Sequence, residues 1–407
     1  MQSPLALRLF VPHSPCVKLA HLADPHLGIR QYHRQTPAGI NQREADVANA
    51  FRAAIDDVIT CRPDVVLIAG DLFHAVRPSN AAIVFAFRQF QRLREALPGV
   101  PVILIAGNHD TPRSTETGNI LRLFEDIGVL VASEEAKRFR FPELDLSILA
   151  VPHQALAGAE RPALRPEGDE TRQVLVIHGE AEGIFAHERD VMEYGGAHVS
   201  ADEIAADAWT YVAWGHYHVR HQVAPRAWYA GSLDYVSSNI WGELDEERQK
   251  GIDGKGWLLV DLDTGAVDPR TVKSARRVLE LPSLDAEGFD AKGIDAWIAE
   301  RVAEVDGGIA GHVVRLVVRN CPRHVGRELD HAAIRAWRNE ALHFQLDLRR
   351  PTVDRVTGVG APGRRQTLGE TLREFLSRRP LPSEIDRERF VQTGVEMLAR
   401  IDAEAEG

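Results

Sequence analysis

The chain has 407 residues, which is long for one compact domain and predicts two or three domains. Hydrophobic residues make up 44% of it and charged residues 26%, a balance that excludes a disordered, collagen-like or membrane-spanning chain. The 48 basic and 59 acidic residues give a net charge of −11, which argues against a protein that mainly coats nucleic acid. A nucleic-acid enzyme is not excluded, because bound metal ions can supply a local positive field.

Four short apolar runs in the first 180 residues each end at a polar residue. They occupy residues 17–22, 65–69, 102–106 and 174–177. Runs rich in β-branched residues are typical of strands that are buried on both faces. Amphipathic helical stretches at 45–59 and 81–97 separate the first three runs. The alternation predicts a layered α/β core.

Later segments predict the rest of the domain organisation. Further strands are expected at 211–215, 228–232 and 256–263, which close a first domain over residues 1–275. Residues 276–365 predict a smaller α/β unit with strands near 278 and at 312–318 and helices at 291–305 and 329–342. Residues 366–407 are expected to form a helical tail with apolar stripes on either side of Pro380-Leu381-Pro382.

Five polar motifs follow the predicted strands. They are DPHLG at 24–28, GDLFH at 70–74, GNHD at 107–110, HGE at 178–180 and GHYH at 215–218. Ligand sites in α/β sheets lie beyond the carboxyl ends of the strands, so these side chains are expected to converge in space. The residues of metal-ligand type among them are Asp24, His26, Asp71, Asn108, His178, His216 and His218.

The donor types of this set indicate a two-metal centre. Imidazole and carboxylate together suit manganese, iron or zinc. The set is too large for one tetrahedral ion with an open position, and it suits two ions that share a carboxylate. Two ions about 3.5–4 Å apart can activate water and clamp both oxygens of a phosphoryl transfer. A single GD turn or core histidine would mean little, but the joint occurrence favours a functional site.

The order D-x-H, GD, GNHD, isolated His and GHxH resembles the signature of calcineurin-like metallophosphoesterases. The wording of DPHLG, GDLFH and GNHD is similar to that of the SbcD-type DNA repair nucleases within that superfamily. The resemblance implies a metallophosphoesterase sandwich over residues 1–275, a DNA-binding cap over 276–365 and a tail at 366–407 that docks on a partner ATPase. Pro25 departs from the pattern, because relatives usually carry a larger residue there.

The same resemblance implies a role for each site residue. Asp24, His26 and His218 would hold the first divalent ion, and Asn108, His178 and His216 the second, with Asp71 bridging. His109 would protonate the leaving oxygen, and His74 would face the substrate phosphate. The metal is expected to be Mn²⁺. Asp110 would either orient His109 or cap the following helix.

The implied function is a Mn²⁺-dependent DNA exonuclease and endonuclease. It would be a homodimeric nuclease subunit of a repair complex with an SMC-like coiled-coil ATPase, acting on duplex ends and single strands. Two alternatives stay open: a phosphodiesterase for a small diester such as a cyclic nucleotide, and a non-catalytic DNA-end scaffold. The extra residues beyond 275 count against the first, and the complete ligand set counts against the second. The tail has its own alternative, which is packing back on the cap.

An arginine-rich stretch in the second unit is a candidate DNA contact. Residues 311–365 contain eleven arginines, no lysine and five acidic residues, a net charge of +6. Arg349, Arg350 and Arg355 are the expected phosphate-binding residues, because arginine forks match phosphate geometry. The alternative is a solvated surface in which these arginines pair with Asp347 and Asp354.

Cysteine use and the first residues suggest the compartment. Cys16, Cys61 and Cys321 are widely spaced and form no C-x-x-C motif, so neither a disulfide scaffold nor a cysteine zinc site is expected. No signal peptide is expected, since the chain starts without a lysine-rich segment or a small-residue cleavage site. We therefore expect a cytoplasmic, nucleoid-associated protein that has no contact with a membrane.

Overall fold

A computed structural model describes residues 16–112, 118–182, 195–351, 368–379, 381 and 385–405. Packing contacts divide the chain into two compact units, residues 1–349 and 350–407. None of the helices in the described ranges has both the length and the apolar character that crossing a membrane requires.

The first of two six-stranded sheets begins the large unit. In spatial order its strands are β14 (Val267–Thr271), β13 (Gly256–Asp261), β1 (Lys18–Leu22), β2 (Val65–Ile68), β3 (Val102–Ile105) and β4 (Leu130–Ala132). Strands β1 to β4 run parallel, and β13 pairs antiparallel with β1. All side chains of β2 and β3 are buried, because both faces of the sheet are covered. The strands β1, β2 and β3 confirm the strands that the first three apolar runs predict.

The second sheet packs face to face on the first. Its strands in spatial order are β11 (His221–Ala224), β12 (Ala227–Tyr229), β10 (Tyr211–Gly215), β7 (Arg172–His178), β6 (Leu146–Val151) and β5 (Lys137–Phe141). Strands β6, β7, β10 and β12 are parallel to one another. Leu67 and Ile103 of the first sheet meet Ile148 and Val176 of the second in one buried core.

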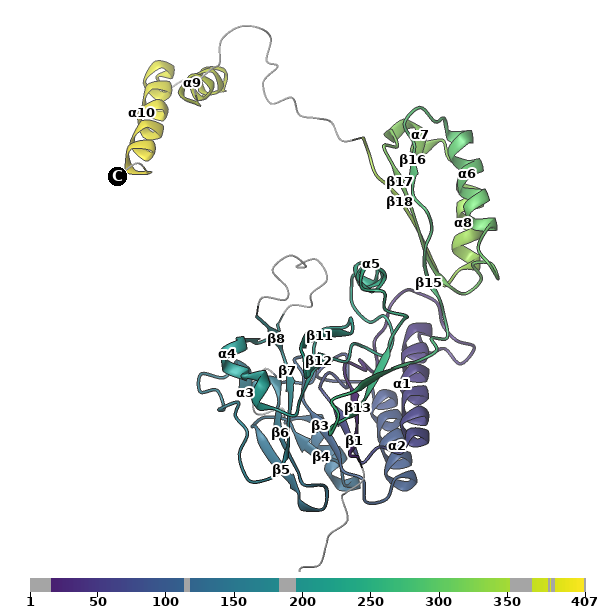
Figure 1. Cartoon of the computed structure of the whole chain (residues 1–407). Helices are drawn as coiled ribbons and strands as arrows, with labels where there is room; N and C mark the ends of the chain where they lie inside the picture. The colour runs from purple at the N-terminus through teal and green to yellow at the C-terminus, as the bar shows by residue number, and fades with distance from the viewer. Residues whose placement is uncertain are drawn as a thin grey trace, which may run out of the picture. The chain divides into compact units, whose positions relative to one another are not determined.

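Helices complete the sandwich by covering its outer faces. The first sheet carries α1 (Gln42–Cys61), α2 (Asn80–Ala96) and the 3₁₀ helix η2 (Ile120–Ile127), and α1 and α2 lie side by side there (Figure 1). Asn41 begins α1 by accepting the N–H groups of Arg43 and Glu44, and Ser79 caps α2 in the same way. The fold is therefore the expected layered α/β sandwich.

Short elements border the second sheet. They are η3 (Pro142–Leu144), α3 (His153–Ala157), the pair β8 (Glu180–Ala181) and β9 (His198–Val199), α4 (Ala201–Ile204) and η4 (Ala206–Ala208). Leu156 of α3 and Ile204 of α4 pack with Trp209 and Trp214 in a core outside the sheet. These elements cover the outer face of the second sheet.

A smaller α/β module follows β14, and we call residues 276–349 the cap. Its parallel sheet contains β15 (Val278–Glu280), β16 (Leu284–Asp285), β17 (Val313–Arg319) and β18 (His343–Leu348), with β17 pairing with each of the others. Its helices are α6 (Ala291–Ala303), α7 (Arg323–Arg327) and α8 (His331–Glu340). The cap has its own core, which includes Ile294, Leu316 and Phe344. The helix α5 (Ile240–Lys250), which precedes β13 in the chain, packs against the cap.

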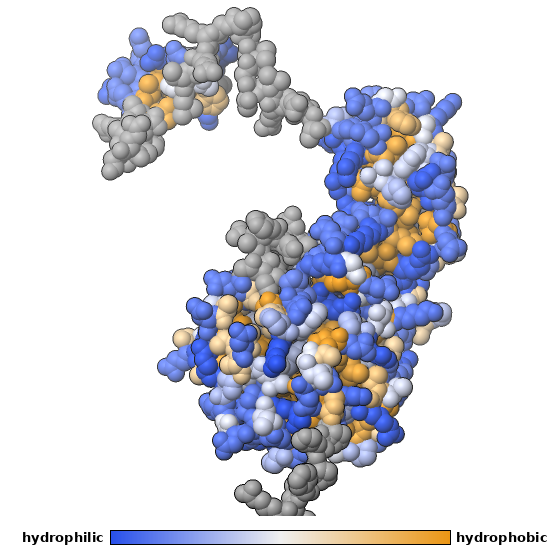
Figure 2. Space-filling view, in the orientation of Figure 1, coloured by the Kyte–Doolittle hydropathy of each residue, from blue (hydrophilic) through white to orange (hydrophobic). Residues whose placement is uncertain are grey.

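Among its described residues, the second unit contains two helices, α9 (Leu368–Arg378) and α10 (Arg387–Ala405). They contact each other, and Gly394 of α10 leaves no room for a side chain beside Leu376 of α9. Apolar and hydrophilic residues both lie on their surface (Figure 2). Phe375 is 58% exposed and Met397 is 62% exposed, so these helices leave apolar side chains uncovered within the unit.

The packing of α2 makes a testable prediction. Leu93 is fully buried against the first sheet, whereas Val84 on the same helix is 47% exposed. Leu93→Ala is expected to lower the free energy of unfolding by about 2–5 kcal/mol, because it leaves a cavity in a close-packed core. Val84→Ala is the control and should change it by about 0.5 kcal/mol or less. Urea unfolding measures both, and equal effects of the two substitutions would contradict this packing.

Candidate metal centre

The strand ends bring the predicted ligands together. Strands β1, β2 and β3 run parallel, as do β7 and β10, so their carboxyl ends meet along one edge of the sandwich. Every ligand candidate lies in or directly after one of these strands. They are Asp24 and His26 after β1, Asp71 after β2, Asn108 after β3, His178 at the end of β7, and His216 and His218 after β10.

The first group of side chains consists of Asp24, His26 and His218. Each offers one ligand atom, these atoms lie within 4.8 Å of one another, and all three residues are buried. Nε2 of His26 is 3.1 Å from Nε2 of His218. Two imidazole nitrogens and a carboxylate that converge in this way suit one divalent transition metal.

The second group consists of Asp71, His178 and His216, with Asn108 beside it. The ligand atoms of the first three also lie within 4.8 Å of one another. Oδ1 of Asn108 is 2.9 Å from Nε2 of His178 and 3.0 Å from Nδ1 of His216. The amide oxygen therefore faces the same point as the two imidazoles.

Asp71 lies between the two groups. Its Oδ2 is 3.3 Å from Nε2 of His178 in the second group and 3.7 Å from Nε2 of His26 in the first. This oxygen is buried, and within the described part of the chain it accepts no hydrogen bond, whereas Oδ1 accepts the His109 N–H at 2.9 Å. A buried carboxylate oxygen without a hydrogen bond needs an explanation, and a shared cation supplies one. The residues present therefore fit a two-metal centre.

Burial and charge shift the acidities of this centre in opposite directions. Burial is the main reason that the pKa of Asp24 rises to about 6. Burial alone would also raise the pKa of Asp71, but the positive charge of His178 outweighs it and holds that pKa well below its usual value. Burial alone would lower the pKa of His178, but the Asp71 carboxylate raises it to about 9. Without a cation, His178 thus supplies positive charge beside Asp71 at neutral pH.

The backbone at the ligands is held in an unfavourable conformation. Asp24, His26, Asp71 and His216 have φ values of 50°, 47°, 49° and 104°, which L-residues with side chains rarely adopt. Such conformations persist only where the surrounding structure enforces them, and they cluster at functional sites. The parallel sheets supply that constraint, and the strained turns direct the donors inward.

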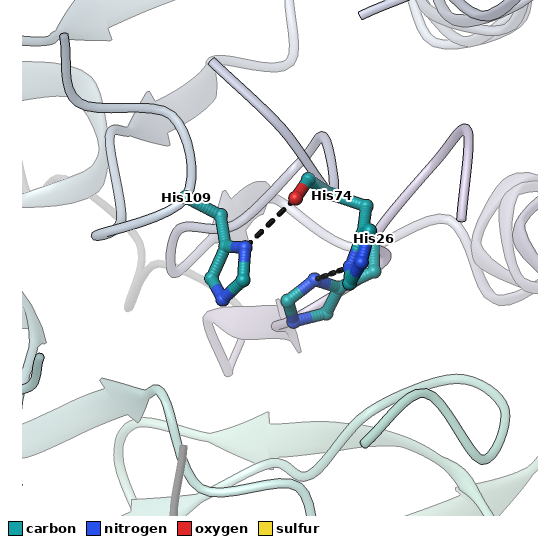
Figure 3. Close-up of side chains that lie close together, drawn as sticks. All are labelled: His26, His74 and His109. Carbon is teal, nitrogen blue, oxygen red and sulfur yellow. Dashed lines mark hydrogen bonds between the residues drawn. The ribbon is translucent and has the colours of Figure 1, made fainter. Parts of the chain in front are cut away.

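Two of the four ligand histidines have their outer nitrogen fixed by main chain or by another histidine. Nδ1 of His178 donates to the Ala69 carbonyl at 2.8 Å, which places its Nε2 toward the second group. Nδ1 of His26 is 3.3 Å from Nδ1 of His74, and its Nε2 faces the first group (Figure 3). A partner on the outer nitrogen fixes both the tautomer and the ring orientation.

The other two ligand histidines have carboxylate partners that the sequence did not reveal. Oε1 of Glu180 is 3.4 Å from Nε2 of His216, and Oε1 of Glu243 is 3.5 Å from Nδ1 of His218. Glu180 closes the HGE motif, so its place beside a predicted ligand was a usable signal. Glu243 lies on α5, where no motif marks it.

The two predicted catalytic histidines lie at the edge of this centre (Figure 3). Nδ1 of His109 donates to the main-chain carbonyl of His74 at 2.8 Å, and the two rings stack with centroids 5.2 Å apart. The His109 ring also meets the His26 ring edge-on at 4.8 Å. Because Nδ1 of His109 holds a proton for the carbonyl, any exchange of a proton with a substrate would occur at Nε2.

Asp110 contacts the main chain of two neighbouring loops. Its carboxylate accepts the N–H groups of Leu72 and Phe73 at 3.0 Å and that of Gly107 at 3.2 Å. It therefore joins the GDLFH loop to the GNHD loop and fixes the turns that carry Asp71 and Asn108. Burial is the main reason that the pKa of Asp110 rises to about 7.

Two of the three predicted DNA-binding arginines lie at the end of the cap, and the third lies outside the described residues. Arg349 and Arg350 follow β18 and are exposed. Nε of Arg349 is 3.1 Å from Oδ2 of Asp347, which is the surface pairing considered as the alternative. Arg355 lies outside the described residues.

Comparisons with known proteins identify the family to which the region carrying this site is similar. Residues 17–220 match the family model of calcineurin-like phosphoesterases, a range that contains every ligand candidate. The chain is 30% identical over 253 residues to the DNA double-strand break repair protein Mre11 of Sulfurisphaera tokodaii, covering 60% of this chain and 59% of that protein. It is 24% identical over 283 residues to Mre11 of Methanocaldococcus jannaschii, with 66% and 70% covered.

A third relative covers more of this chain. Mre11 of Archaeoglobus fulgidus is 28% identical over 316 residues, covering 71% of this chain and 66% of that protein. Across the three relatives, the matched part spans 59% to 70% of the relative's length.

The turn at Gly70 makes a prediction about the site. Gly70 has a φ of +93°, and a Cβ there would overlap the His178 ring, whereas Gly99 has a φ of +85° and open space around it. Gly99→Ala is expected to lower the free energy of unfolding by about 1–2 kcal/mol through backbone strain alone. Gly70→Ala should cost about 1–3 kcal/mol more, because overpacking adds to that strain. Urea unfolding compares the two, and equal losses would show that the close approach to His178 is absent.

Proposed function

The chain belongs to the calcineurin-like phosphoesterase family, and from that premise we propose that it is a Mn²⁺-dependent DNA nuclease that hydrolyses phosphodiester bonds at a two-metal site. The observation that carries the proposal is the buried Asp71 oxygen between two groups of imidazole and oxygen donors. The relatives' printed description as DNA double-strand break repair proteins supports DNA as the substrate. The proposed nuclease acts both as an exonuclease and as an endonuclease.

The ligand residues divide between two ions. Asp24, His26 and His218 would hold the first ion, and Asn108, His178 and His216 the second, with Asp71 shared. A mixture of imidazole, carboxylate and amide oxygen suits Mn²⁺. When bound, the ions would supply Lewis acidity toward the phosphate oxygens and activate water for attack on phosphorus.

The remaining chemistry belongs to His109 and His74. His109 would protonate the departing oxygen at Nε2, because its Nδ1 is held by the His74 carbonyl. General acid catalysis of this kind contributes about 10²- to 10⁴-fold to a rate. The same hydrogen bond sets the direction of the His109 ring, and His74 would contact the substrate phosphate from the adjacent loop. Asp110 would keep both loops in place through its three main-chain contacts.

The cap and the tail would serve substrate and partner. We assign residues 1–275 to the nuclease domain, 276–365 to a DNA-binding cap domain that includes the cap and the residues after it, and 366–407 to a docking tail. Arg349, Arg350 and Arg355 would contact DNA phosphates, which the net charge of +6 over residues 311–365 supports. An SMC-like coiled-coil ATPase would bind the exposed apolar side chains of α9 and α10.

A homodimer is the proposed assembly. Leu123 on η2 is 36% exposed and lines a surface hollow together with Ile83 of α2, and a second copy of the chain would cover these apolar side chains.

The catalytic assignment is tested by separating metal binding from chemistry. His109→Ala should slow cleavage of labelled duplex DNA by about 10²- to 10⁴-fold while the protein still binds two Mn²⁺ ions, because His109 is not a ligand. Asp71→Ala should remove both metal binding and cleavage. His33→Ala, at an exposed loop position between β1 and α1, is the control and should behave like the wild type.

Three results would contradict this account. Loss of Mn²⁺ from His109→Ala would show that the residue holds metal. Retained cleavage by Asp71→Ala would place the active site elsewhere. Strong turnover of a chromogenic small diester without any cut DNA would favour the small-diester enzyme over the nuclease.

The acidity of His178 makes a second prediction. Its pKa of about 9 in the metal-free protein means that Nε2 holds a proton at neutral pH, and binding of an ion must displace it. Below that pKa the apparent Mn²⁺ affinity should therefore rise with pH, and it should level off above about pH 9. Titration calorimetry at pH 7 in two buffers of different ionisation enthalpy would detect the released proton. Identical heats in both buffers would contradict the prediction.

A further inference from the structure

The helix α5 turns a charged face toward the protein interior. Glu243, Glu246 and Glu247 are 0%, 5% and 3% exposed, although carboxylates are rarely buried. Burying a charge is costly unless it is paired and hydrogen-bonded. A helix with three buried carboxylates beside the metal centre therefore calls for a specific role.

Glu243 and Lys255 together contact His218. Oε1 of Glu243 is 3.5 Å from Nδ1 of His218, and Oε2 forms an ion pair with the ammonium group of Lys255. Nζ of Lys255 donates to the main-chain carbonyl of His218 at 2.9 Å and is 2.9 Å from Oε1 of Glu247. The pair thus holds both the side chain and the backbone of one ligand residue.

The charges of this pair are mutually supported. Burial alone would raise the pKa of Glu243, but the nearby ammonium of Lys255 lowers it below its usual value. Burial alone would lower the pKa of Lys255, but Glu243 and Glu247 raise it. The Lys255 ammonium also lies 4.7 Å from the centre of the Tyr235 ring, and the Tyr235 hydroxyl donates to Glu247 at 2.6 Å. Glu243 is therefore a fixed carboxylate.

The opposite face of α5 belongs to the interface with the cap. Nε1 of Trp241 donates to Oε1 of Gln345 on β18 at 2.9 Å. The guanidinium of Arg315 on β17 lies 5.6 Å from the centre of the Trp241 ring. Trp241 also packs in one buried cluster with Val313 and Leu342 of the cap. One short helix thus contacts a predicted ligand on one side and the cap sheet on the other.

We propose that Glu243 is a positioning residue for the first metal ion, and that α5 ties the affinity for that ion to the cap. The proposal rests on the two-metal function above. A carboxylate on Nδ1 fixes the His218 tautomer that presents Nε2 to the first group of ligands, and it makes the imidazole a better donor. Because α5 is also packed on β17 and β18, the cap constrains the carboxylate that orients this ligand.

The test uses the full-length protein with Mn²⁺ alone, titrated by calorimetry and by electron paramagnetic resonance of free Mn²⁺. Glu243→Gln should lower the affinity for one of the two Mn²⁺ ions by about 10- to 100-fold and leave the affinity for the other unchanged. A double variant, Glu243→Gln with Lys255→Met, removes both charges of the ion pair and should show the same selective loss. Glu246→Gln is the matched control, because that buried carboxylate on α5 pairs with Lys250 and Tyr217 instead.

The outcomes separate this inference from the proposed function. A wild-type protein that binds fewer than two Mn²⁺ ions would overturn the two-metal function itself. If the wild type binds two ions and the double variant unfolds cooperatively and binds both with unchanged affinity, only the proposed role of Glu243 is overturned. An equal loss of affinity for both ions would also overturn the role of Glu243. Restoration of DNA cleavage by the Glu243→Gln variant at high Mn²⁺ would support it, since a merely unfolded site would not recover.

The link to the cap has its own variant. Trp241→Leu keeps an apolar side chain but removes the hydrogen bond to Gln345 and the ring beneath Arg315. It is expected to lower the affinity for the same ion that Glu243→Gln affects, by a smaller factor. Unchanged affinity for that ion in folded Trp241→Leu protein would overturn the link between the cap and the metal centre.

Discussion

The structure depends on a single carboxylate that faces two groups of donors at once. Oδ2 of Asp71 is buried, accepts no hydrogen bond among the described residues and lies within 4 Å of an imidazole from each group. Such an arrangement is unfavourable for the chain alone, because a buried acceptor loses its hydration without compensation. The positive charge of His178 offsets part of that cost in the metal-free protein. A pair of shared cations would offset it further and relieve the site.

The rest of the fold maintains this costly arrangement. Two parallel-rich sheets place five strand ends along one edge, and four of the seven ligand candidates have a positive φ that only a rigid frame would hold. Asp110 joins two of the loops through main-chain contacts. Each ligand imidazole has a partner on its outer nitrogen, and for His218 that partner is held by a buried lysine. Precision at the centre therefore comes from residues that do not themselves bind metal.

The sequence was sufficient for the ligand set and insufficient for what holds it. Strands β2 and β3 are continuous apolar runs that end at Asp71 and Asn108, so their position and the convergence of the ligands followed from simple rules. Strand β6 was not predicted: Ser147 interrupts its apolar run, and His153 after it matches no ligand motif, although the charges of His178, Asp71 and His216 act on that imidazole. The helix α5 was missed because its buried face is charged, and hydrophobic periodicity detects only apolar faces. Glu243 has no local signal, since its partners are distant in sequence.

The most direct measurement is anomalous diffraction at the manganese edge from crystals soaked in Mn²⁺. The account predicts two peaks about 3.5–4 Å apart with the Asp71 carboxylate between them. One peak, or two peaks that do not share Asp71, would contradict it.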